Sequence, residues 1–230
     1  MKDDKNKRNK ALWLNIFIYN LIWLVYYIFE MLNGRMETWY LKVMNLIFPM
    51  IFFTLWSLLS YIASLRCKHE MSRAKIFNVI FIFVIIDQGI KDIIRNYFPL
   101  EHHIQLLSNW LYLYPIVNTK GSWAASRFGL DMGIKVYIIF NIIFFPVTIY
   151  VYKYYSQSYR KSFFLNSSFI LIFAGIVCSL IDKVFWGGSL DYILIKDIFV
   201  ADLKDIYITL GAGSLIIEML LNNKIYLKEN

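Results

Sequence analysis

Long apolar runs separated by short charged segments dominate the chain. A helix needs about 20 residues to cross a bilayer, and six of these runs are close to this length. They cover residues 11–32, 43–65, 76–94, 134–152, 163–184 and 205–222. Pro49 and Pro146 lie inside two of the runs, and neighbouring helices tolerate such residues in a membrane. The pattern predicts an all-α polytopic membrane protein with about six transmembrane helices.

The segment between the third and fourth runs has a different pattern. Residues 97–133 contain Pro99, Pro115 and several Gly and Asn turn candidates, and leucine alternates with tyrosine over residues 111–114. Alternation and turn residues predict a small β-rich or irregular module. Its tryptophans and tyrosines suit the headgroup level of a membrane. We expect this module to form a small extracytoplasmic cradle.

Composition supports the membrane assignment and excludes other classes. The chain is 59% hydrophobic and 17% charged, whereas soluble domains carry about 25% charged residues. No soluble module with a basic face is visible, so we expect no nucleic-acid partner. Cys67, Cys178 and the three histidines show neither a disulfide framework nor metal-ligand spacing. We therefore expect no metal and no cofactor.

The distribution of positive charge predicts the orientation in the membrane. Of the 24 Lys and Arg residues, 14 lie in the N-terminal tail, residues 66–75, residues 153–161 and the C-terminal tail. With six helices these four segments share one side, and the positive-inside rule makes that side cytoplasmic. We expect a multi-pass protein of the cytoplasmic membrane with both termini inside. The charged end of the third helix, the 97–133 module and the loop after the fifth helix then meet at the outer surface.

Acidic residues gather in residues 174–213. They are Asp182, Asp191, Asp197, Asp202 and Asp205. Carboxylates at the edge of a bilayer are costly to desolvate, so such a cluster is a functional-site candidate. Two facing carboxylates can share a proton and so act as acid and base on water without a metal. Asp191, which follows a Gly187-Gly188 turn, and Asp205, which starts the sixth helix, are candidates for this pair.

Each acidic residue also fits a simpler structural role. Asp205 fits a helix N-cap or a first-turn acid. Asp191 fits a solvated ion pair with Lys196, and Asp87 with Lys91 fits an i,i+4 pair on one helix face. A proton or ion pathway is a third interpretation, but it requires polar residues across the whole bilayer, and here they gather at one surface.

Three blocks of sequence resemble lipoprotein signal peptidase (signal peptidase II), a family of membrane aspartic peptidases. The first block, Asp87-Gln88-Gly89-Ile90-Lys91, fits the family's D-Q-x-x-K. The second, Asn118 followed by Gly121 and Ala124-Ala125, is loosely similar to its N-x-G-A-A-F, with extra residues. The third runs from Gly175 through Asp182, Asp191 and Asp205 to Gly211 and resembles the family's last two helices. The resemblance covers residues 76–222, four of the six helices. Residues 1–75 then form a two-helix N-terminal membrane extension, and residues 223–230 form a cytoplasmic tail. The chain is thus similar to a divergent member with two extra helices.

The resemblance implies an endopeptidase that removes signal peptides from diacylglyceryl-modified prolipoproteins. Asp191 and Asp205 would be the catalytic pair. The residues supporting substrate and pair would be Asp87, Lys91, Asn118, Gly121, Ser179, Asp182 and Lys183. Lipid-modified precursor proteins and membrane lipids are the expected partners, and we expect a monomer.

Several positions depart from the family's pattern. Ser179 and Lys183 stand where the family has Asn and Arg, and Asp202 stands where it has Asn. In an alternative register Asp202 would be the partner of Asp191, but Asp205 preserves the spacing to the following I-T-x-G. Lys204, beside the pair, is expected to depress a carboxylate pKa. A second hypothesis therefore stays open, namely a catalytically altered or inactive paralogue that binds lipopeptides or lipoproteins in the membrane.

Overall fold

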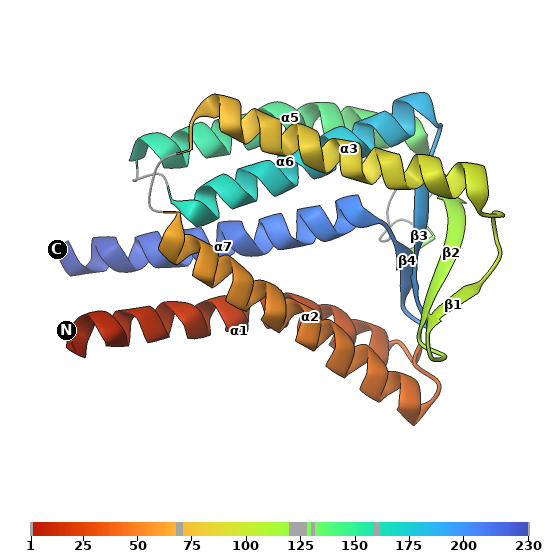
Figure 1. The fold of residues 1–230 in the computed structure, drawn as a ribbon, viewed down its shortest axis with the longest axis horizontal. Helices are drawn as coiled ribbons and strands as arrows, with labels where there is room; N and C mark the ends of the chain where they lie inside the picture. The colour runs from red at the N-terminus through yellow and green to blue at the C-terminus, as the bar shows by residue number, and fades with distance from the viewer. Residues whose placement is uncertain (1, 68–70, 120–127, 130–131, 159–161, 230) are drawn as a thin grey trace.

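The protein is a bundle of long helices with a small sheet at one end (Figure 1). The structure, a computed structural model, describes residues 2–67, 71–119, 128–129, 132–158 and 162–229. The helices in this part of the chain are α1 (Lys2–Leu32), α2 (Trp39–Arg66), α3 (Arg73–Tyr97), α5 (Gly133–Ser158), α6 (Phe163–Phe185) and α7 (Leu203–Glu229). The strands are β1 (Ile104–Leu107), β2 (Leu111–Asn118), β3 (Ser189–Ile195) and β4 (Phe199–Ala201).

Each of the six predicted apolar runs lies within one helix, which confirms the predicted fold class. Pro49 lies inside α2 and Pro146 inside α5, as expected. By length and composition α1, α2, α5 and α6 qualify as membrane spans. Helices α3 and α7 are similarly long but carry the charged side chains described below, which lower their hydropathy.

Helix α6 lies at the centre of the bundle. In the apolar part of α6, 72% of the residues are buried inside the protein. In the corresponding part of α5 only 6% are buried, so most of its side chains face outward. Helices α6 and α7 approach closely because glycines leave room. A Cβ on Gly211 would lie only 2.7 Å from the Ile172 side chain, and one on Gly175 only 2.5 Å from that of Ile208. Small residues at such contacts are typical of helix packing in membranes.

The sheet draws strands from two separate segments of the chain. All neighbours are antiparallel, in the order β1-β2-β3-β4. The first two strands come from the predicted cradle, residues 97–133. The other two come from the connection between α6 and α7, for which the sequence predicts a loop. The register of β2 and β3 pairs Ile116 with Asp191 and Asn118 with Ser189, so it brings Asn118 beside Asp191.

A tight turn leads from α6 into β3, as the two adjacent glycines predict. Gly187 has a φ of 66°, in the left-handed region that glycine adopts without strain. A Cβ on Gly188 would lie 3.1 Å from the carbonyl oxygen of Asn118. The chain can therefore pass close under β2 and enter the sheet at once. Both chain termini lie at the end of the bundle opposite the sheet (Figure 1).

Candidate active site

Charged side chains from distant segments meet where the helices reach the sheet. They are Asp87 and Lys91 on α3, Asp182 on α6, Asp191 on β3, and Asp202, Lys204 and Asp205 at the start of α7. All of these except Asp205 are buried. Because a buried charge is costly unless it is paired, the buried groups need partners within the protein.

Lys91 is the centre of the buried network. Its Nζ lies 2.9 Å from Oδ2 of Asp87, 2.6 Å from Oδ2 of Asp182 and 2.7 Å from Oδ2 of Asp202, and its side chain is fully buried. Gln88 adds a second bridge, because its Nε2 donates to Asp87 and to Asp182 at 3.0 Å each. One ammonium group and one amide thus join α3, α6 and the start of α7.

Asp202 is held by two ammonium groups. Its Oδ2 accepts hydrogen bonds from Lys204 and from Ser189, in addition to the ion pair with Lys91. Burial by itself would raise the pKa of Asp202, but the positive charges of Lys204 and Lys91 lower it to about 2. Asp202 is therefore ionised at neutral pH, and its charge is paired within the protein.

Asp191 has a different environment. Its Oδ2 accepts a hydrogen bond of 2.8 Å from Nδ2 of Asn118. Its Oδ1 is buried and has no hydrogen-bond partner among the described residues, although Nζ of Lys204 lies 3.6 Å away. Burial raises the pKa of Asp191, and the nearby charge of Asp202 adds to this, while Lys204 and Asn118 oppose it. This carboxyl group can therefore gain and lose a proton at a higher pH than an ordinary aspartate.

Asp205 faces the open side of the cluster. Its backbone N–H donates to Oδ1 of Asp202 at 3.2 Å, and its Oδ2 accepts the N–H of Asp202 at 3.3 Å. This reciprocal arrangement is a capping box at the start of α7. One carboxylate oxygen from each of Asp191, Asp202 and Asp205 lies within 4.8 Å of the other two. Distance therefore does not distinguish Asp202 from Asp205, but burial and pairing do.

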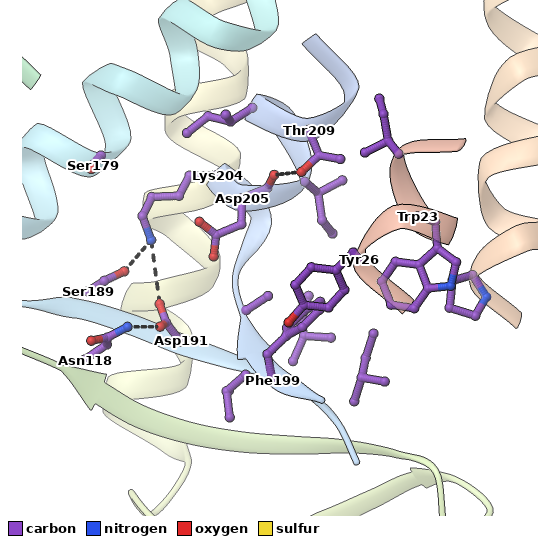
Figure 2. A pocket seen from close by; sticks show the side chains of 18 of the residues that line it. Trp23, Tyr26, Asn118, Ser179, Ser189, Asp191, Phe199, Lys204, Asp205 and Thr209 are labelled. Carbon is purple, nitrogen blue, oxygen red and sulfur yellow. Dashed lines mark hydrogen bonds and ion pairs between the residues drawn. The ribbon is translucent and has the colours of Figure 1, made fainter. Parts of the chain in front are cut away.

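A large, mainly apolar cavity opens at these carboxylates. It has a volume of about 1060 Å³, and Asp191, Lys204 and Asp205 form its polar end. Asp202 is not among the described residues that line it. Figure 2 shows Asp205 between a polar group, which includes Asn118 and Asp191, and an aromatic group of Trp23, Tyr26 and Phe199. An apolar substrate in this cavity would meet Asp191 and Asp205 together.

Ser179 and Lys183 form a separate polar contact on the α6 wall of the cavity. Nζ of Lys183 donates to Oγ of Ser179 at 2.7 Å, and Nδ2 of Asn141 donates to the same oxygen at 3.2 Å. All three side chains line the cavity. Gly121, which the sequence also indicated, lies outside the described residues.

Three polar residues with hydrogen bonds at this site were absent from the predicted site, namely Gln88, Asn141 and Ser189. A signal existed for Gln88, because it directly follows Asp87 in a recognised block. For Asn141 and Ser189 the only signal is a polar side chain within a strongly apolar segment. Asn141 contacts Ser179, 38 residues away, and Ser189 contacts Asp202, 13 residues away. Each partner belongs to another element, so spacing alone does not reveal these contacts.

The three clustered carboxylates could in principle bind a cation. Lys204, however, is hydrogen-bonded to Asp202 and faces Asp191, so an ammonium group already supplies positive charge at this point. The prediction of a site without a metal stays a prediction.

Comparison with known proteins gives consistent matches over the same region. The model of the family Signal peptidase (SPase) II matches residues 79–221. A lipoprotein signal peptidase of Sinorhizobium fredii is 26% identical over 149 residues, which are 63% of this chain and 86% of the relative. One of Brucella ovis is 29% identical over 144 residues, which are 61% of this chain and 86% of the relative.

Solved structures support the fold. A bacterial membrane enzyme determined at 2.3 Å by the in meso method has a TM-score of 0.54 and 20% identity, over 66% of this chain and 90% of that one. A second bacterial membrane enzyme, determined at 1.9 Å, also has a TM-score of 0.54, with 22% identity over 64% of this chain and 94% of that one.

Proposed function

The chain belongs to the signal peptidase II family, and we propose that it cleaves lipid-modified precursor proteins with Asp191 and Asp205 as its catalytic pair. One observation carries the choice of residues. Both side chains line the same cavity, with carboxylate oxygens within 4.8 Å of each other. Asp202 is equally close, but it is fully buried and already paired with two lysines. It therefore serves the proposed site as a structural cap.

The contacts of the two carboxylates favour a division of roles. Asp191 accepts a hydrogen bond from the side-chain amide of Asn118 and lies near the ammonium group of Lys204. Both contacts favour the ionised form of Asp191. The charge of Lys204 also acts on Asp205, but the hydrogen bond that the Asp205 side chain accepts comes from the backbone N–H of Asp202, a weaker donor than the charged groups that hold Asp202. We assign the shared proton to Asp205, so Asp191 is the base and Asp205 the acid.

The reaction then needs neither a covalent intermediate nor a cofactor. Asp191 takes a proton from water while the water oxygen bonds to the scissile carbonyl carbon, and Asp205 gives its proton to the carbonyl oxygen. In the second step Asp191 gives its proton to the leaving nitrogen as the C–N bond breaks. Asp205 regains a proton from the resulting diol, which becomes the new carboxyl group. Both side chains end in their starting states.

The supporting residues hold this geometry in the proposed mechanism. Lys91, Asp87 and Asp182 fix the start of α7 through Asp202, and Asn118 fixes Asp191. Ser179 and Lys183 would contact the substrate backbone or headgroup, because their polar atoms lie on the cavity wall. The proposed catalytic unit is residues 76–222, which agrees with the extent of the family match.

The proposal also includes an orientation. The sheet end would lie at the outer surface and both termini in the cytoplasm. Support comes from the 14 Lys and Arg residues in the four predicted cytoplasmic segments, and from the two termini lying together opposite the sheet (Figure 1).

The direct test is cleavage by the purified protein in lipid. A diacylglyceryl-modified precursor should be cut just before the modified cysteine, and the same precursor without lipid should be cut far more slowly. Binding of the modified precursor without any turnover would contradict the proposal and favour the alternative, a paralogue that holds lipopeptides without cleaving them.

A further inference from the structure

Two helices outside the family match form one wall of the cavity. Helix α1 contributes residues between 22 and 29, among them Trp23, Val25 and Tyr26, and α2 contributes residues between 48 and 53, among them Phe48 and Phe52. The family match begins only at residue 79. The cavity that opens at Asp191 and Asp205 is thus partly built by a segment for which the family provides no role.

Helix α1 is fixed firmly against the helix that carries Asp205. The Tyr19 hydroxyl lies 2.7 Å from Oγ of Ser214 on α7 and 3.3 Å from the carbonyl oxygen of Leu210. Gly213 makes this approach possible, because a Cβ there would lie 2.4 Å from the Tyr19 ring. Tyr19 is fully buried. The α1 wall therefore has a defined position relative to Asp205.

Helix α2 is fixed to the sheet through one buried amide. Asn45 accepts a hydrogen bond of 2.6 Å from Nε1 of Trp110 and donates to the carbonyl oxygen of Lys196 at 3.2 Å. Its own carbonyl oxygen accepts from Nε1 of Trp23 at 2.9 Å, which ties α1 to the same point. Phe48 stacks on Trp110 with ring centroids 4.8 Å apart. The two helices and the sheet are thus joined next to the cavity.

The lining and the position of the cavity indicate its occupant. Away from its polar end at Asp191, Lys204 and Asp205, aromatic and aliphatic side chains dominate the lining, and a volume of about 1060 Å³ is enough for flexible hydrocarbon chains. In the proposed substrate the lipid is attached next to the scissile bond, so its chains start beside Asp191 and Asp205.

We propose that α1 and α2 are a specificity element that encloses the acyl chains of the substrate and sets the chain length that the site accepts. This inference rests on the proposed function for the identity of the substrate. It assigns to residues 22–29 and 48–53 the apolar contacts of the lipid. Longer acyl chains gain affinity by burying more methylene groups against these residues, about fourfold for each group.

The first test uses a ligand that requires no catalysis. A diacylglyceryl-cysteine peptide with photoreactive groups near the ends of its acyl chains is bound to the purified protein, irradiated and mapped by mass spectrometry. Adducts within residues 22–29 and 48–53 are expected. Adducts confined to α3, α5 and α6 would overturn the inference. Adducts at residues 22–29 or 48–53 from a photoreactive leucine of a signal peptide, instead of from the acyl chains, would also overturn it.

The second test compares two matched substitutions on α1. Val25 lines the cavity, whereas Ile28, one turn further along, is exposed and is not among its lining residues. Val25→Trp should weaken binding of a long-chain lipopeptide by about tenfold relative to a short-chain one, which is the loss of about two buried methylene groups. Ile28→Trp should leave this ratio unchanged. An unchanged ratio in Val25→Trp would overturn the inference, whether or not the wild-type protein cleaves a precursor, so failure here is distinct from failure of the proposed function.

Discussion

Asp202 and Asp205 cap each other at the start of α7. Each side chain accepts the backbone N–H of the other residue, at 3.2 and 3.3 Å. This relationship explains why the sequence offers two candidate partners for Asp191, since the two residues of one capping box both lie close to it. The surroundings of the two side chains nevertheless differ. Asp202 turns its remaining oxygen toward Lys91 and Lys204, while Asp205 faces the cavity.

The first prediction concerns the charge pair that accompanies this cap. Asp202→Asn keeps an N-cap acceptor but leaves Lys204 and Lys91 with less negative charge, so we expect a loss of about 3–5 kcal/mol in unfolding free energy. Lys204→Ala should also lower the unfolding free energy. The loss in the double variant should be smaller than the sum of the two single losses by about 0.5–3 kcal/mol, because each single change leaves a buried charge without its partner. Titration with SDS in mixed micelles would measure these values.

Asp92→Asn is a suitable control for this cycle. Asp92 is exposed on the same helix as Lys91, so its substitution should change the unfolding free energy by less than about 0.5 kcal/mol. Strict additivity of the Asp202 and Lys204 changes would show that the two side chains are not coupled.

The second prediction separates loss of activity from loss of the fold at low pH. The pKa of Asp202 is about 2 in the folded protein and about 3.9 in an unfolded chain, so its contribution to stability is present above about pH 4 and is lost as the pH falls toward 2. Asp191 has a raised pKa, so its ionised form is lost at a pH above its ordinary value of about 3.9. Cleavage should therefore fall at a higher pH than the near-UV circular dichroism signal. Coincident loss of the two signals would contradict this assignment.

The third prediction concerns Lys204 as a positioning residue. Its ammonium group lies 3.6 Å from Oδ1 of Asp191 and lowers the pKa of that group. In Lys204→Met the acidic limb of the pH–rate profile should move upward by about 1–3 units, the usual effect of an opposite charge at this distance. Lys204→Arg should restore most of the wild-type profile, whereas Lys135→Met, an exposed change on α5, should have no effect. A lower rate with an unshifted profile would reduce Lys204 to a purely structural role.

The fourth prediction tests how the extra helices are held. Gly213→Ala places a methyl group 2.4 Å from the buried ring of Tyr19, so we expect a loss of about 1–3 kcal/mol in unfolding free energy. Gly89→Ala is the matched control, because a Cβ at Gly89 meets nothing within 4 Å. That change should stabilise α3 by about 0.5–1 kcal/mol. Equal effects of the two substitutions would show that α1 does not pack tightly on α7.

The helices could be predicted from the sequence because apolar length is a local property. Each of the six runs lies in one helix, and the Gly187-Gly188 turn lies where the two glycines indicate. Strands β3 and β4 were not predicted, although Leu190 to Ile195 is a run of residues common in strands. The pairing of β3 with β2 depends on contacts between distant segments, such as Asn118 with Asp191, which are 73 residues apart, and sequence spacing does not encode such contacts.

The candidate residues of the site could be found from the sequence, but their roles could not all be separated. Asp191, Asp202 and Asp205 were each singled out by charge in an apolar setting or by resemblance. The choice between Asp202 and Asp205 depends on which side chain Lys91 and Lys204 reach, and this is a property of the packing of α3 against α6 and α7. Asn45 was missed because its partners, Trp110 and the Lys196 carbonyl group, lie in other elements.

The most direct measurement of the central claim is cleavage of a diacylglyceryl-modified precursor by Asp205→Asn and Asp202→Asn side by side. Asp205→Asn, like Asp191→Asn, should lower the rate by about 10⁴-fold or more, as loss of an essential catalytic group does. Asp202→Asn should retain cleavage within about tenfold of the wild-type rate once the reaction is run where the variant is folded, because its carboxylate is structural. Loss of cleavage in Asp202→Asn together with a normal rate in Asp205→Asn would contradict the assignment of the pair.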